Sequence, residues 1–126
     1  MTTIKTLTVR QPWAWSIFLD DAPKDVENRS RATSYRGPLL IHAGQVYERW
    51  AETFLARIGV QPAPQESLAF GGIVGVVELV DCVRGSHSRW AMPDCWHWIL
   101  RRPRALPFRA VRGQQGLFSV QYDLAT

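Results

Sequence analysis

The clearest pattern along the chain is a series of short apolar stretches separated by Gly, Pro and polar residues. Residues 73–83 carry Val, Ile or Leu at most positions, and residues 39–41 form an unbroken Leu-Leu-Ile run, both typical of buried β-strands. His42 ends the second run and is expected to be a hydrogen-bonded structural residue rather than a base. Further strands are predicted over residues 4–9, 95–100, 108–111 and 117–124.

Two segments have a helical pattern. Pro12 opens the apolar segment 13–19, which is apolar on nearly every side and should either be buried on more than one face or have Trp15 lining a ligand surface. Residues 45–58 predict an amphipathic helix that ends at Gly59, because apolar side chains recur there every three to four residues. The recurring side chains are Val46, Trp50, Phe54 and either Leu55 or Ile58.

The connecting segments are rich in Pro, Gly and polar residues. Loops are predicted over residues 30–36, 60–72 and 84–93, a basic turn between Pro103 and Pro107, and a turn over residues 112–116.

Short strands of mixed length with two interrupting helices predict an α+β fold, specifically a small, partly open β-barrel with helices at its rim. Strands and helices do not alternate regularly, which argues against a doubly wound sheet. A length of 126 residues fits a single domain, residues 1–126, with a core that needs no metal or disulfide.

The charge balance favours an anionic partner. Fifteen Lys and Arg residues against eleven Asp and Glu residues give a net charge of +4, and Lys5 and Lys24 are the only lysines. From Arg84 onward seven arginines face two acids, Asp94 and Asp123. Because the planar guanidinium suits bidentate contacts with phosphate, this bias is compatible with nucleic acid.

The cysteines and the hydropathy of the chain indicate in which cellular compartment the protein is expected. Cys82 and Cys95 do not make a disulfide framework, no basic start leads into an apolar leader, and no apolar stretch is long enough to cross a bilayer. The sequence therefore predicts a reduced, cytoplasmic protein without a membrane partner. Together with His87 and His97 the cysteines match no common zinc spacing, so no metal or other cofactor is expected.

The segment 24–29 concentrates charged and polar groups. In an extended strand Glu27 and Arg29 share one face and Lys24 lies on the other. Lys24 and Glu27 meet only if the backbone is still turning at Lys24, which the preceding Pro23 favours. The alternative is a polar edge strand whose Glu27–Arg29 pair lies on a solvated face and contributes little to the stability of the fold.

Four blocks of the chain, taken in order, resemble the ASCH domain family of the PUA-like superfamily. They are Leu-Thr-Val-Arg-Gln-Pro-Trp-Ala (7–14), Lys-Asp-Val-Glu-Asn-Arg (24–29), Tyr-Arg-Gly-Pro-Leu-Leu-Ile-His-Ala (35–43) and Val-Arg-Gly-Gln-Gln-Gly-Leu-Phe (111–118). The resemblance implies a β-barrel with helices that exposes a cleft, and a role in binding RNA or modified nucleosides.

The same resemblance implies candidate chemistry. Some small members of the family are acetylcytidine amidohydrolases and some have been assigned ribonuclease activity, both using a lysine in a K-x-x-x-x-R segment. Lys24 and Arg29 match that lysine and arginine, and Glu27 stands where the amidohydrolase pattern has a threonine. Lys24, Glu27 and Arg29 are therefore the candidate catalytic residues.

The function expected is binding of RNA or a modified nucleoside in a cleft around Lys24, Glu27 and Arg29. Cations would contact phosphate, an aromatic ring would stack on a base, and an amide or carboxylate would contact a base edge. The remaining candidate binding residues are Gln11, Trp13, Tyr35, Arg36, Arg112 and Gln114. A hydrolase of the same family is the second hypothesis, and a protein-interaction module with an arginine-rich face is the third.

Overall fold

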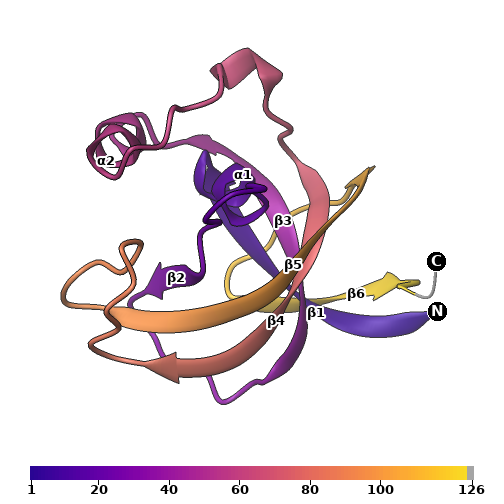
Figure 1. The fold of residues 1–126 in the computed structure, drawn as a ribbon. Helices are drawn as coiled ribbons and strands as arrows, with labels where there is room; N and C mark the ends of the chain where they lie inside the picture. The colour runs from indigo at the N-terminus through magenta and orange to yellow at the C-terminus, as the bar shows by residue number, and fades with distance from the viewer. Residues whose placement is uncertain (125–126) are drawn as a thin grey trace.

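A computed structural model of the protein describes residues 1–124 (Figure 1). It is a small α+β protein dominated by one sheet, which confirms the coarse fold class predicted from the sequence. The elements in chain order are β1 (Thr2–Gln11), α1 (Trp13–Ile17), β2 (Val26–Arg29), β3 (Gly37–Tyr47), α2 (Ala51–Arg57), a short 3-10 helix η1 (Gln65–Ser67), β4 (Gly72–Val83), β5 (Trp96–Ala110) and β6 (Leu117–Tyr122).

The six strands form a single mixed sheet in the order β2-β5-β4-β3-β1-β6. β1 and β3 pair in parallel, with Leu7 opposite Ile41, and every other neighbouring pair is antiparallel. Within residues 1–124 the edge strands β2 and β6 do not pair with each other, so the sheet is not closed. In Figure 1 the sheet bends around α1.

Both faces of the central strands are covered, which explains the unbroken apolar run at residues 39–41. Leu39 and Ile41 pack with Ile17 of α1 in the larger cluster of buried residues. Leu40 points to the opposite face and packs with Phe118 of β6 in a second, smaller cluster. Successive side chains of a strand alternate between faces, so a strand buried on both sides is apolar throughout.

α1 is short and buried on several sides, as its sequence predicts. Trp13, Ala14, Ser16 and Ile17 are all buried. The Ser16 hydroxyl donates to the Pro12 carbonyl, which satisfies the one polar side chain in the buried set.

The predicted helix over residues 45–58 is wrong over residues 45–50. β3 continues to Tyr47, which lies opposite Gln11 of β1, and Val46 is 48% exposed rather than buried. The helix is confined to α2, residues 51–57. Pairing with a distant strand satisfies the backbone of residues 45–47, and the local four-residue spacing of apolar side chains carries no information about that partner.

The predicted basic turn between Pro103 and Pro107 is also wrong, because β5 runs without interruption from residue 96 to residue 110. Pro103 falls where the pairing with β4 slips between Arg101 and Arg104, and Pro107 falls in a second slip. Arg102 takes a positive φ of 52° at the first of these irregularities. Bulges of this kind tolerate proline, since the ladder hydrogen bond that proline cannot donate is already missing there.

Residues 1–124 contain no helix that combines the length and the apolar character needed to span a bilayer.

The alternation along β4 predicts opposite responses to truncation of two neighbouring residues. Leu79 is completely buried, whereas Val80 is 39% exposed. We expect Leu79→Ala to lower the free energy of unfolding by about 2–5 kcal/mol, because it leaves a cavity in the core. Val80→Ala should lower it by less than about 1 kcal/mol. Urea unfolding followed by circular dichroism measures both, and equal losses would contradict the assigned faces.

Candidate functional site

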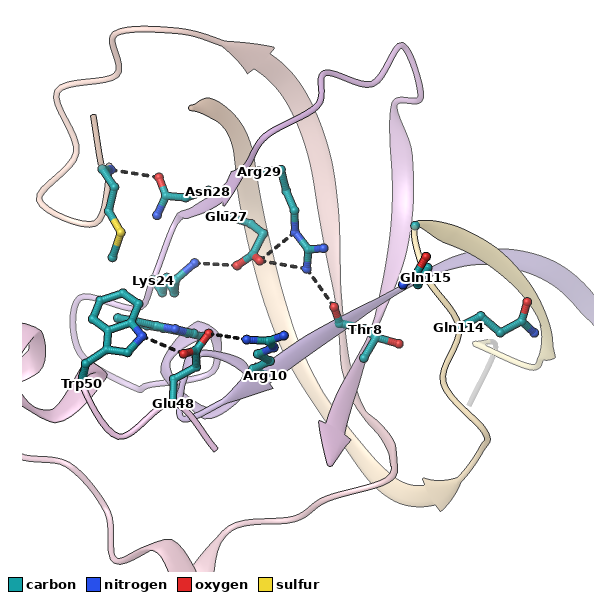
Figure 2. A pocket seen from close by; sticks show the side chains of 13 residues that line it. Thr8, Arg10, Lys24, Glu27, Asn28, Arg29, Glu48, Trp50, Gln114 and Gln115 are labelled. Atoms are coloured by element: carbon teal, nitrogen blue, oxygen red, sulfur yellow. Dashed lines mark hydrogen bonds and ion pairs between the residues drawn. The ribbon is translucent and has the colours of Figure 1, made fainter. Parts of the chain in front are cut away.

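An open pocket of about 530 Å³ lies between the amino-terminal part of the chain and three later loops (Figure 2). Five segments of the sequence contribute to its wall, so only the folded chain brings them together. The lining residues are Thr8, Arg10, Trp13, Lys24, Glu27, Asn28, Arg29, Glu48, Trp50, Met92, Gln114, Gln115 and Gly116.

Lys24 and Glu27 form a buried ion pair in this pocket. Lys24 is 3% exposed and Glu27 7%, and Lys24 Nζ lies 2.7 Å from Glu27 Oε1. The ammonium also donates to the carbonyl oxygen of Val26. Lys24 precedes β2, and its backbone N–H still donates to Ser16 O in α1 at 2.9 Å. The chain is therefore turning at Lys24, which is the condition under which the sequence allowed the pair to form.

Arg29 completes a three-residue charge cluster (Figure 2). Its Nε donates to Glu27 Oε2 at 3.0 Å, and its Nη2 lies 3.0 Å from the same oxygen. Nη2 also donates to Thr8 O of β1 at 2.8 Å. β2 is an edge strand, as the solvated alternative required, but burial of Glu27 rules out a solvated face for this pair.

The charges around Glu27 determine its protonation. Burial by itself would raise the pKa of Glu27, but attraction to Lys24 and then to Arg29, with hydrogen bonds from both, brings the pKa below its ordinary value of 4.5. Glu27 is thus a carboxylate at neutral pH, and each of its oxygens accepts a bond from one cation.

A second acidic residue arranges the rim of the pocket. Glu48 accepts a bond from Arg10 Nη1 at 3.0 Å through one oxygen and from Trp50 Nε1 at 2.6 Å through the other. Trp50 is 52% exposed, and its ring centroid lies 5.4 Å from that of Trp13. Lys24 Nζ in turn lies 5.7 Å from the centre of the Trp13 ring. The rim thus presents a fixed indole next to a fixed guanidinium, both held by Glu48.

Asn28 also reaches the pocket wall, but its side chain is used structurally. Its Nδ2 donates to Trp90 O at 3.0 Å, and its Oδ1 accepts from the backbone N–H of Met92 at 2.9 Å. These bonds fix the loop that carries Met92. Cys95 Sγ donates to the same Oδ1 and to Met92 O.

Of the histidines and cysteines considered as a metal motif, His97 and Cys95 form hydrogen bonds to other parts of the chain. His97 Nδ1 accepts from Ser86 N at 3.0 Å, and His97 Nε2 donates to Met92 O at 2.7 Å. Both Cys82 and Cys95 are free thiols. Residues 1–124 contain no group of three or more His, Cys, Asp or Glu side chains arranged to hold a metal ion.

The structure brings together five of the candidate residues in one pocket and places four elsewhere. Those that line it are Trp13, Lys24, Glu27, Arg29 and Gln114. Gln11 is 2% exposed and bridges backbone groups, donating to Ala69 O and accepting from Trp15 N. Arg112 lines a different pocket.

Tyr35 and Arg36 lie in the loop before β3. The Tyr35 hydroxyl donates to the Pro38 carbonyl. Arg36 donates to the carbonyl oxygens of Thr33 and Tyr35 and lies 3.7 Å from an oxygen of Asp81. Both side chains therefore order their own loop.

Several lining residues were missed as site residues from the sequence. Arg10 had a visible signal, since it lies two residues after Thr8 on the same face of β1 and directly precedes Gln-Pro-Trp in the first family-like block. Trp50 was assigned to the apolar face of a helix, which hid its exposure. Glu48, Met92 and Gln115 had no local signal.

No protein-family model matches the chain, and a search of curated proteins finds no match. Function is therefore inferred from the geometry of the pocket and from the four sequence blocks.

Neutralising Glu27 should weaken the fold and flatten its response to acid. Glu27→Gln removes the countercharge of two cations, one of them buried, so we expect a loss of about 3 kcal/mol at neutral pH. Because the folded-state pKa of Glu27 is lowered, its stabilising effect is complete above pH 4.5 and is lost as the pH falls below that value.

Denaturant unfolding between pH 3 and pH 7 measures this effect, with Glu66→Gln, an exposed residue of η1, as the control. The acid-dependent loss should shrink only in Glu27→Gln. An unchanged pH profile in that variant would contradict the role of the cluster.

Proposed function

We propose that this chain is an ASCH-type, PUA-like domain that binds a nucleotide of RNA, or a modified nucleoside, in the pocket around Lys24, Glu27 and Arg29. The observation that carries the proposal is the combination, in one open pocket of about 530 Å³, of a buried cation–carboxylate cluster with a half-exposed indole. Pockets of several hundred cubic ångströms take ligands of nucleotide size.

Stacking on Trp50 supports recognition of a base. The ring is held at its Nε1 by Glu48, so its orientation is set before the ligand arrives, and half of its surface is available. Bases stack on aromatic side chains with little dependence on sequence, and tryptophan offers the largest face. Gln114 and Gln115 across the pocket supply amide groups suited to the polar edge of a base.

The charges of the pocket favour a singly charged phosphodiester. Arg10, Lys24 and Arg29 contribute three positive charges, and Glu27 and Glu48 contribute two negative ones, which leaves the pocket at +1. Arg10 is the accessible cation, with 59% of its side chain exposed. A guanidinium at the rim contacts a phosphate without requiring its burial.

The curvature of the sheet supports the PUA-like part of the proposal. Three strands separate β2 from β1 in the sheet order, yet Arg29 of β2 bonds to Thr8 of β1. A flat sheet would keep these strands more than 10 Å apart, since neighbouring strands are spaced by about 4.8 Å. We infer that the sheet curls into a partly open barrel with α1 and α2 at its rim.

Changing Trp50 should weaken nucleotide binding without unfolding the protein. Trp50→Leu removes the stacking surface, and we expect the Kd for a short single-stranded RNA to rise by about tenfold or more. Phe108→Leu, which replaces an equally exposed aromatic ring outside the pocket, should leave the Kd unchanged. Fluorescence polarisation at low salt measures both, and RNA that fails to bind the wild type there would contradict the proposal.

A hydrolase is the second candidate, favoured by the burial of Lys24 beside a carboxylate at the pocket wall. Glu27 has a lowered pKa and accepts bonds on both oxygens, which makes it a weak general base. Binding without turnover is therefore the function that we prefer.

Turnover separates the two candidates. We expect acetylcytidine and short RNAs to be converted at the same residual rate by the wild type, Lys24→Ala and Glu27→Gln, as followed by chromatography. Conversion by the wild type that disappears in both variants, with circular dichroism showing both folded, would establish the hydrolase instead.

A further inference from the structure

A second pocket of about 530 Å³ adjoins the first and has no assigned role. The two pockets share Thr8, and two other segments line both of them in succession. β3 supplies His42 to the second pocket and is followed by Glu48 at the first, while Arg112 and Gly113 lead directly to Gln114. The pockets are therefore neighbours along the same three segments of the chain.

The lining of the second pocket carries a positive charge and consists largely of small residues. It contains no carboxylate, and Arg112 is its permanently charged side chain. Arg112 is exposed and takes part in none of the salt bridges formed within residues 1–124. Gly44 and Gly71 pack closely against side chains of the same wall, since a Cβ would lie 2.9 Å from Thr8 Cγ2 at Gly44 and 2.6 Å from Gln45 Nε2 at Gly71.

The boundary between the pockets is rigid. His42 Nε2 donates to the Val111 carbonyl, so Nδ1 accepts from the Thr8 hydroxyl at 3.2 Å. His42 is thus hydrogen-bonded on both ring nitrogens, as the sequence predicts. Gly113 packs onto this pair, since a Cβ there would lie 2.8 Å from His42 Cε1 and 3.0 Å from Thr8 Oγ1. The shape of the junction is consequently set before any ligand binds.

We propose that the ligand is an RNA of at least two nucleotides, whose neighbouring nucleotide occupies the second pocket while Arg112 contacts the phosphodiester that joins them. This inference rests on the proposed function, because it places one nucleotide in the first pocket. A free nucleoside fills that pocket alone and has no phosphate for Arg112, and a mononucleotide leaves the second pocket empty. Arg112 lines the second pocket two residues before Gln114 of the first, so an arginine without a salt-bridge partner in residues 1–124 lies close to where the phosphate linking two nucleotides would pass.

The test compares ligands of equal phosphate number. The four homodinucleotides of RNA are titrated against the four corresponding nucleoside 5′-monophosphates by calorimetry at low salt. We expect the best dinucleotide to bind about tenfold more tightly than its mononucleotide. A monophosphate carries at least as much negative charge as a dinucleotide, so charge alone predicts no such gain.

Arg112→Gln should abolish most of the dinucleotide gain while leaving the affinity for a free nucleoside unchanged. With an eight-nucleotide RNA it should also reduce the dependence of log K on log salt by about 0.7, the contribution of one phosphate contact in a single strand. Arg104→Gln is the matched control, because Arg104 is an exposed arginine of β5 that lines neither pocket.

The outcomes distinguish this inference from the function on which it rests. If mononucleotides bind as tightly as dinucleotides and Arg112→Gln changes neither affinity, the role proposed for the second pocket is overturned but the proposed function is not. Equal losses of RNA affinity in Arg112→Gln and Arg104→Gln would also overturn that role, since they would indicate a non-specific electrostatic attraction between the protein and RNA. If neither ligand binds the wild type, the proposed function itself fails.

Discussion

The burial of Lys24 is the constraint on which the rest of the site depends. An ammonium removed from water is strongly destabilising unless acceptors surround it, and here they are Glu27 and the carbonyl of Val26. Glu27 then requires its own compensation, which Arg29 provides from two residues further along β2. Arg29 in turn bonds to Thr8, so the chain of compensation reaches β1 and joins strands that are not neighbours in the sheet. Satisfying one buried charge thereby fixes how strongly the sheet curves and where the pocket opens.

Such a cluster is more readily explained by function than by stability. Replacing buried ion pairs by apolar residues of similar volume is often neutral or stabilising, so a core that needed only to fold would not require these charges. Departures from local rules of this kind are expected at functional sites. The surrounding polar groups support the distinction, because Asn28 and His97 are fully engaged in fixing the loop around Met92. The groups that remain exposed at the rim are those of Arg10, Trp50 and the glutamines that follow β5.

The features that the sequence predicts best are those that depend on residues close together in the chain. The apolar runs identified β3 and β4, and the spacing of Lys24, Glu27 and Arg29 within six residues marked the charge cluster. The local pattern gives the wrong element where the structure depends on pairing with a distant strand. Residues 45–47 continue β3 because β1 lies beside them, and the prolines of β5 lie in bulges of its pairing with β4. The site divides in the same way. Glu48 has no local signal because its role arises from contact with Arg10, 38 residues earlier, and Trp50 was assigned to the apolar face of a helix although it bonds to Glu48 at the rim.

The same electrostatics constrain what the pocket can do with a ligand. Because Lys24 and Arg29 already share the charge of Glu27, an incoming phosphate cannot take both cations without leaving that buried carboxylate unpaired. An anionic group is therefore held more easily at Arg10 or Arg112, whose positions are exposed, while the buried cluster sets the shape and potential of the pocket floor. In this arrangement the buried charges of Lys24, Glu27 and Arg29 form the pocket floor, and the exposed arginines are the groups that contact an anion. It is compatible with the proposed ligand, a nucleotide within a strand, whose charge would lie on the linking backbone and whose ring would lie against Trp50.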